Sequence, residues 1–175
     1  MRSITKYLTE SKTQTNRSRV GTFIIHNNKL ILGDATQPGN PYKYKYFFPG
    51  GGIDPGETCI DAAIRESQEE IAMIPANVKL LKHKNNPSKQ CNLKDFKYDC
   101  CTFYYVYAKK GKIDKSVWGL DDGFKTPPIE LSVKETINWL KWCIKKTKTR
   151  SYKNVKYKLD LLMLYELIKK KILKK

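Results

Sequence analysis

A run of glutamates around one arginine, placed behind a glycine-rich segment, constrains the fold of this chain more than any other feature. The segment Phe48–Gly52 reads Phe-Pro-Gly-Gly-Gly, and a helix is expected to follow it over residues 58–71. Within that helix Glu66, Glu69 and Glu70 lie at positions i, i+3 and i+4, so they share one face. Like charges at that spacing destabilise a helix by roughly a few tenths of a kcal/mol per pair. A hard divalent cation with oxygen ligands would offset this repulsion directly.

The same stretch resembles the Nudix box. That pattern is a glycine, five residues, a glutamate, seven residues, and then Arg-Glu-aliphatic-x-Glu-Glu-x-Gly-aliphatic. The positions that match at the required spacing are Gly51, Glu57, Arg65, Glu66, Glu69 and Glu70. Three positions depart from the pattern: Ser67 replaces the first aliphatic residue, Ala72 replaces the glycine, and Met73 is an acceptable aliphatic residue. These departures concern only helix packing and the helix exit. The alternative, a solvated acidic helix face, does not account for the Pro-Gly-Gly-Gly segment.

The resemblance implies a magnesium or manganese site built from this segment. The ligands it assigns are the carboxylates of Glu66, Glu69 and Glu70 and the backbone carbonyl of Gly50. Glu66 is either the third carboxylate ligand or the general base. Arg65 and Glu57 are expected to pair, so that Arg65 holds the carboxylate cluster through bidentate contacts. The alternative for Arg65 is an ordinary surface arginine.

Many members of this family bring a further glutamate from outside the box, on the stretch that leads into a tryptophan-bearing strand. Glu135, four residues before Trp139, is the best candidate for this catalytic role. Glu130, Asp121 and Asp122 are rivals in the preceding loop. For each of them a solvated surface acid is the alternative.

Substrate contacts are less well defined by the sequence. Tyr44 and Tyr46 alternate with lysines before the box, and aromatic faces can stack bases while lysines meet phosphates. The alternative is an edge strand whose lysines prevent aggregation. Arg19, before the first strand, could reach a phosphate or belong to a solvated tail. Trp118 could cover a base or pack inward.

Charge and composition bound the function further. The chain of 175 residues carries a net charge of +17, a balance that attracts nucleotides, polyphosphates or RNA. Drift of an AT-rich genome toward lysine is the alternative explanation. An odd number of cysteines, five, without a Cys-x-x-Cys pair favours free thiols. No apolar run approaches the length of a membrane span and no secretory signal is visible, so we expect a cytoplasmic protein that does not enter a membrane.

The pattern of elements predicts a single α/β domain. Residues 1–16 form a polar N-terminal segment, and the domain is expected over residues 17–175. The predicted strands are Val20–His26 and Lys29–Leu32 around an Asn27-Asn28 turn, Tyr42–Phe47, Val78–Lys82, Tyr98–Ala108 and Glu135–Ile144. The predicted helices are residues 58–71, with Thr58 as N-cap and Pro75 as the stop, and Val155–Leu173. With the resemblance, this order predicts a Nudix-type α/β/α sandwich with a mixed sheet.

Three functions remain in competition. The resemblance implies a pyrophosphohydrolase in which water attacks phosphorus in a nucleoside diphosphate linked to another moiety, such as a nucleotide sugar, a dinucleotide or an NTP. The same chemistry could act on an RNA 5′ cap or 5′ pyrophosphate. A non-catalytic module that binds a nucleotide or nucleic acid is the third, although the intact Glu66, Glu69 and Glu70 argue against it. Members of the family often dimerise, so a homodimer is also considered.

Overall fold

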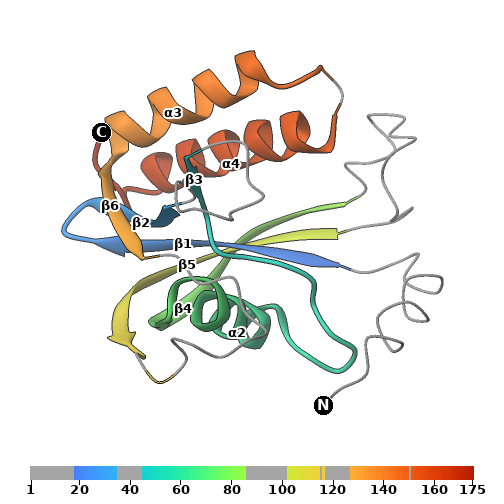
Figure 1. The fold of residues 1–175 in the computed structure, drawn as a ribbon, viewed down its shortest axis with the longest axis vertical. Coiled ribbons are helices and arrows are strands. Elements are labelled where there is room, and N and C mark those ends of the chain that lie inside the picture. The colour runs from blue at the N-terminus through green and yellow to red at the C-terminus, as the bar shows by residue number, and fades with distance from the viewer. Residues whose placement is uncertain (1–17, 35–44, 86–101, 115, 117–126, 150) are drawn as a thin grey trace.

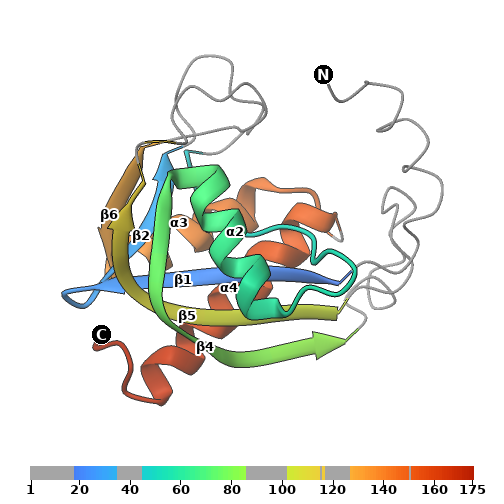
Figure 2. The same ribbon diagram turned by 90° about the horizontal axis from the view of Figure 1, so that it is seen from below.

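A mixed β-sheet lies between helices on both of its faces. The computed structural model describes residues 18–34, 45–85, 102–114, 116, 127–149 and 151–175. Helix α2 (Cys59–Ile71) covers one face, and helices α3 (Val133–Lys146) and α4 (Tyr152–Lys169) cover the other (Figures 1 and 2). This arrangement confirms the predicted α/β/α sandwich. Within the described residues, no helix is long and apolar enough to cross a membrane.

The sheet combines parallel and antiparallel pairs. Its main path runs in the order β3, β2, β1, β5, β4, and β6 pairs with β2. Strands β1 and β5 are parallel, and the other pairs are antiparallel. The strand bounds are β1 Arg19–His26, β2 Lys29–Asp34, β3 Tyr46–Phe47, β4 Met73–Asn85, β5 Thr102–Ile113 and β6 Pro128–Ser132.

The first two strands form the predicted hairpin. Asn27 and Asn28 occupy its turn with φ angles of 48° and 58°. Positive φ at both central residues is the backbone of a tight two-residue hairpin turn, and asparagine tolerates it better than most side chains. The turn prediction is therefore confirmed.

Strands β1 and β2 pair only near this turn, and the glycine-rich segment enters between them farther along. Gly33 of β2 pairs with Pro128 of β6 and with Phe47 of β3, so these partners lie on opposite edges of β2. Beyond β3, the Val20 N–H donates to the Gly51 carbonyl and the Thr22 N–H to the Pro49 carbonyl, both at 2.9 Å. The sheet thereby fixes the backbone of the glycine-rich segment beside β1.

Apolar side chains fill both faces of the sheet. The larger core lies under α3 and α4 and contains an aromatic group in which Phe23 contacts Phe48 edge to face and Phe48 contacts Trp139 in the same way. Smaller clusters lie under α2, where Ala62, Ala63 and Ile71 are fully buried. Helix α2 is thus held on one face of the sheet, and α3 and α4 share the core on the other.

One predicted element is wrong in type. Residues 135–144, predicted as a strand, belong to helix α3. Its buried positions Val133, Thr136, Ile137, Leu140 and Cys143 recur at helical spacing. Ser132 and Glu135 form a capping box at its start. The β-branched and aromatic residues of this stretch concealed the helical period.

Other boundaries also differ from the predictions. Helix α2 ends at Ile71, where Ala72 takes a left-handed conformation, so Pro75 is not the stop but lies inside β4. Strand β5 continues past Ala108 to Ile113. Residues 42–44 and 98–101 of the predicted strands lie outside the described residues. Cys59 and Cys143 are free thiols, as predicted, and the other three cysteines are outside the described residues as well.

Candidate active site

Helix α2 presents the glutamates from a well-defined N-terminus. The Thr58 hydroxyl accepts a hydrogen bond from the Asp61 N–H (3.1 Å) and donates one to the Asp61 carboxylate (2.6 Å). Thr58 is therefore the N-cap, as predicted. Asp61 holds the capping hydroxyl, and this bond fixes the first turn. The helix then places Glu66, Glu69 and Glu70 along one side.

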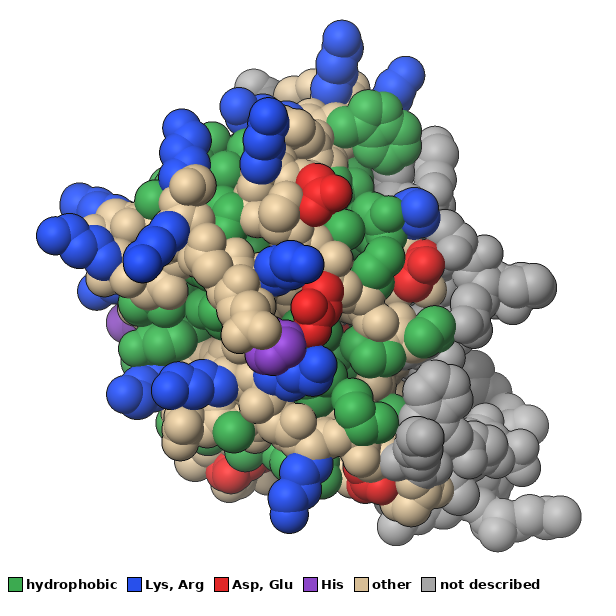
Figure 3. Space-filling model, turned by 90° about the vertical axis from the view of Figure 1, so that its left-hand side faces the viewer, with side chains coloured by type: hydrophobic (Ala, Val, Ile, Leu, Met, Phe, Trp, Pro, Cys, Tyr) green, Lys and Arg blue, Asp and Glu red, His purple; other side chains and the backbone are tan. Residues whose placement is uncertain are grey.

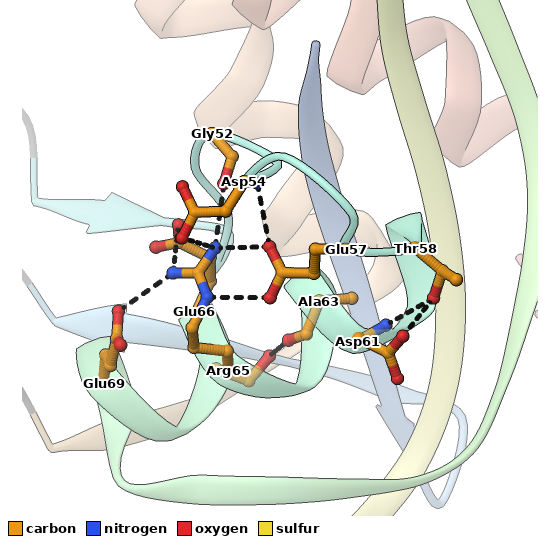
Figure 4. A network of polar contacts seen from close by, with 10 residues as sticks. Gly52, Asp54, Glu57, Thr58, Asp61, Ala63, Arg65, Glu66 and Glu69 are labelled. Atoms are coloured by element: carbon orange, nitrogen blue, oxygen red, sulfur yellow. Dashed lines mark hydrogen bonds and ion pairs between the residues drawn. The ribbon is translucent and has the colours of Figure 1, made fainter. Parts of the chain in front are cut away.

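Arg65 lies at the centre of a network that ties this helix to the glycine-rich segment (Figure 4). Its Nε and Nη2 donate to the two carboxylate oxygens of Glu57, both at 2.9 Å, and Nη2 also donates to the Gly52 carbonyl at 2.9 Å. Its Nη1 donates to Glu66 Oε1 (2.9 Å) and Glu69 Oε2 (3.2 Å). The hydrogen bonds to Glu57 and Glu66 raise the pKa of Arg65, so it stays charged. Arg65 and Glu57 pair as the sequence predicted, and the surface-arginine alternative is wrong.

The carboxyl group of Glu70 contacts the backbone of the glycine-rich segment. Its Oε2 accepts a hydrogen bond from the Gly50 N–H at 2.9 Å. Burial raises the pKa of Glu70 to about 8, while the Gly50 bond and the charges of Lys156 and Arg19 oppose the rise. The loop and the helix therefore meet at a carboxyl group whose negative charge is poorly compensated.

Two glycines allow this close approach. A Cβ at Gly50 would overlap the backbone carbonyl oxygen of Val20, and a Cβ at Gly51 would meet the Glu66 carboxylate. Glu66 has only 13% of its side chain exposed, and this burial raises its pKa. The glycines of the segment thus bring the backbone against β1 on one side and against Glu66 on the other.

The donor set suits a hard divalent cation, although the carboxylates do not surround a single point. Oxygen ligands are those that Mg²⁺ prefers. Burial raises the pKa of Glu70, and a cation bound here would favour its charged form. In the part of the chain that the structure describes, no three His, Cys, Asp or Glu side chains are gathered in a metal-binding group. Glu69, with 54% of its side chain exposed, is the member that can turn away from Arg65 toward a cation.

A cavity of about 140 Å³ opens beside Glu70, between the sheet and the helices α3 and α4. Two of the predicted substrate contacts, Arg19 and Tyr46, lie in its wall. Its other lining residues are Phe47, Phe48, Gly50, Glu70, Trp139, Lys153, Lys156, Tyr157 and Asp160. The cavity therefore joins the acidic cluster to aromatic rings and to three cationic side chains.

Sequence reasoning missed the part of this wall that α4 supplies. Lys153, Lys156, Tyr157 and Asp160 recur at three- and four-residue intervals, which places them on one side of the helix. That spacing was visible in the sequence, but nothing local shows that this side of α4 faces the glutamate cluster.

One predicted site residue, Glu135, is not brought to the cluster. Glu135 accepts hydrogen bonds from the Ser132 N–H (2.8 Å) and hydroxyl (2.6 Å) as part of the α3 capping box. Ser132 pairs with Lys29 at the hairpin end of the sheet, whereas the glycine-rich segment pairs with Val20. At about 3.3 Å per strand residue, these ends are roughly 20 Å apart. The role of general base predicted for Glu135 does not fit this position.

Of the rival acids, Glu130 is the one that the structure describes. Glu130 contacts His26 Nδ1 (2.8 Å) and Lys110 Nζ (3.2 Å) on the surface, at the same end of the sheet as Glu135. Tyr44, Trp118, Asp121 and Asp122 lie outside the described residues, so their predicted roles stay predictions.

Comparisons with known proteins agree with this geometry. A family model described as NUDIX domain matches residues 15–132. An ADP-ribose pyrophosphatase of Methanocaldococcus jannaschii is 34% identical over 70 residues, which are 40% of each chain. An RNA pyrophosphohydrolase of Psychrobacter sp. is 51% identical over 70 residues, which are 40% of this chain and 38% of the relative. The match thus spans less than half the length of these curated relatives.

Solved structures resemble the whole fold at low identity. An ADP compounds hydrolase superposes with a TM-score of 0.60 at 20% identity, covering 91% of this chain and 76% of that one. A Bacillus subtilis pyrophosphohydrolase gives a TM-score of 0.56 at 18% identity, covering 91% and 85%. At these identities the likeness establishes the α/β/α fold.

Proposed function

Because this chain belongs to the Nudix family, whose domain model matches residues 15–132, we propose that it is a metal-dependent pyrophosphohydrolase. Its substrate would be a nucleoside diphosphate linked to another moiety. One observation carries the proposal: Glu70 of α2, joined to the Gly50 backbone, borders a cavity lined by cations and aromatic rings, and Arg65 holds Glu66 and Glu69 on the same side of the helix. Relatives named ADP-ribose pyrophosphatase and RNA pyrophosphohydrolase support it.

The metal would be Mg²⁺ or Mn²⁺, held by Glu66, Glu69, Glu70 and the Gly50 carbonyl. The carbonyls of Pro49 and Gly51 accept hydrogen bonds from β1. Because successive carbonyls alternate in extended backbone, that of Gly50 is expected to face away from β1. When bound, such a cation would neutralise phosphate charge and acidify a coordinated water.

The side chains of the chain itself would prepare this chemistry. Arg65 keeps Glu57 and Glu66 at fixed positions, and so aligns α2 with the glycine-rich segment. Glu70, with a pKa of about 8, would give up its proton as a cation binds. Glu66, whose pKa is raised by burial, is suited either to binding the cation or to accepting a proton from the attacking water.

The test is product release with Mg²⁺ from a panel of NTPs, ADP-ribose, nucleotide sugars, dinucleoside polyphosphates and capped RNA. The wild type is compared with Glu69→Gln and Glu70→Gln, and with Glu135→Gln as a matched change outside the cluster. Hydrolysis that disappears in the first two variants and persists in Glu135→Gln supports the proposal. Activity that survives Glu70→Gln would contradict the metal site.

RNA is the second candidate substrate, and two observations favour it. The relative with 51% identity over the matched segment is named an RNA pyrophosphohydrolase. Basic side chains (lysine and arginine) are also spread over the face that carries the C-terminus and the β1–β2 hairpin (Figure 3). Affinity for capped or triphosphorylated RNA should fall steeply with salt, because each phosphate contact releases counterions. A small nucleotide should show a shallow slope.

Three further predictions stay open beside this proposal. A non-catalytic binding module would hold nucleotides without hydrolysing any compound of the panel, and the retained carboxylates of α2 weigh against it. A homodimer and a cytoplasmic location likewise remain predictions from the sequence.

A further inference from the structure

An acid buried in helix α4 is not explained by the fold or by the metal site. Asp160 has 3% of its side chain exposed, and burial raises its pKa. Its Oδ1 accepts a hydrogen bond from the hydroxyl of Tyr105, a core residue of β5, at 3.2 Å. Burying a carboxyl group is unfavourable unless it is paired, so its retention in the core needs a reason.

The partner of Asp160 is Lys156, one helical turn earlier. Lys156 Nζ lies 3.1 Å and 3.0 Å from the two carboxylate oxygens of Asp160, and 26% of the Lys156 side chain is exposed. An ammonium group has three N–H donors. Two are directed at Asp160, which leaves the third for a ligand in the cavity that Lys156 lines.

Both Lys156 and Glu70 line this cavity. Gly50 and Asp160 line the same cavity. Arg19 and Lys153 add two more cations, and Trp139 and Tyr157 meet edge to face in the same lining, with ring centroids 6.0 Å apart. A ligand that fills the cavity between Glu70 and Lys156 should therefore carry negative charge near Lys156. It should also have a flat part that can pack against the aromatic rings.

Anchoring α4 to the sheet does not require the ion pair. Met163, Leu164 and Leu167 of the same helix are fully buried in the main core and provide that contact. A buried ion pair often stabilises a fold no better than apolar residues of similar size. Fixing the direction of a charged group toward a ligand is a role that apolar residues cannot take.

We propose that Lys156 binds a phosphate group of the substrate in this cavity, with Asp160 and Tyr105 as positioning residues that hold its ammonium group toward the ligand. The inference rests on the proposed function for its substrate class. It adds a phosphate-binding residue in α4 to the proposed metal ligands in α2.

The test measures binding rather than turnover. Inorganic pyrophosphate and ADP, each with Mg²⁺, are titrated into wild-type protein and into Lys156→Gln by isothermal calorimetry. Lys158→Gln is the matched control, because Lys158 is an exposed lysine of the same helix. Loss of a charge-assisted hydrogen bond predicts about 10- to 100-fold weaker binding for Lys156→Gln. Lys158→Gln should bind as the wild type does, and Lys156→Arg should recover part of the affinity.

A double variant separates ligand binding from a structural effect. Lys156→Gln leaves Asp160 buried without its cation and can destabilise the protein, whereas Lys156→Gln/Asp160→Asn leaves two neutral amides. Thermal melting should return toward the wild-type temperature in the double variant while phosphate binding stays weak. If both stability and affinity return to the wild-type level, Lys156 has only a structural role and the inference is overturned.

Failure of the inference and failure of the proposed function give different results. Wild-type protein that hydrolyses a compound of the panel but binds neither probe through Lys156 would overturn the inference and leave the function standing. Binding that depends on Lys156, with no hydrolysis of any compound, would support the inference and reject the catalytic function.

Discussion

Replacing Arg65 tests whether the acidic cluster is held together by one side chain. Arg65→Ala removes five hydrogen bonds of 2.9–3.2 Å, to Glu57, Glu66, Glu69 and the Gly52 carbonyl. It leaves the Glu57 and Glu66 carboxylates, with 15% and 13% of their side chains exposed, without this cation. We therefore expect a marked loss of stability in metal-free protein.

The magnitude follows from the burial of the partners. Hydrogen bonds to charged groups contribute about 1.5–3 kcal/mol each, but bonds that share one guanidinium group are not additive. Breaking a buried ion pair costs about 3–5 kcal/mol. Because 28% of the Arg65 side chain is exposed, water and mobile ions replace part of the interaction. We expect a loss of about 2–4 kcal/mol in the free energy of unfolding.

A double-mutant cycle with Glu57→Gln identifies the origin of the loss. Urea unfolding followed by circular dichroism, with EDTA present, gives the unfolding free energy of each single variant and of the double variant. The bidentate pair predicts that the double variant loses about 1–2 kcal/mol less than the sum of the single variants. Lys141→Ala, at an exposed position of α3, should change stability by no more than about 0.5 kcal/mol.

Two results would refute this reasoning. A loss below about 1 kcal/mol for Arg65→Ala would mean that the contacts resemble those of an exposed surface pair. Additive effects of Arg65→Ala and Glu57→Gln would mean that the two side chains do not interact energetically, whatever their distance.

Three more predictions follow from single contacts. The pKa of Glu70 in the folded protein is about 8, above its ordinary value of 4.5, so between these values the folded state keeps a proton that the unfolded chain loses. Stability without metal should therefore fall as the pH rises from about 4.5 to about 8, and melting curves of Glu70→Gln should lack this fall. Ser132→Ala should cost about 0.5–2 kcal/mol through loss of the α3 capping box, measured by urea unfolding, while turnover stays unchanged. Asn28→Gly keeps the turn but loses both hydrogen bonds to the Lys174 backbone (2.9 and 2.6 Å), so hydrogen exchange should accelerate at the C-terminal end and not in β1.

The acidic half of the site was predictable because its geometry is local. Glu66, Glu69 and Glu70 lie within two turns of one helix, so their common face follows from helical spacing alone. The pairing of Arg65 with Glu57 is also short in sequence. Ala72, where the box has glycine, shows why that position is special, because its φ of 53° is a left-handed conformation that glycine adopts at little cost.

Helix α3 was not predictable in the same way. Its stretch is rich in β-branched and aromatic residues, which favour strands on average. The capping box at Ser132 and the spacing of Ile137, Leu140 and Cys143 were present in the sequence as helix signals. Burial against the core favoured the helix over the strand. The prediction for Glu135 depended on a strand at that place, so it does not fit the structure.

The basic half of the site depends on contacts between residues far apart in sequence. Lys156 reaches the cavity because Met163, Leu164 and Leu167 seat α4 on the core, and because Tyr105 of β5 meets Asp160 inside it. None of these contacts affects the spacing of the glutamates in α2. A chain can therefore keep the Nudix box unchanged while α4 varies, so the proposed metal site and the proposed phosphate contact of Lys156 can change independently. On this argument, the identity of the substrate has to be sought in α4 and the aromatic wall around Trp139 rather than in the box that identifies the family.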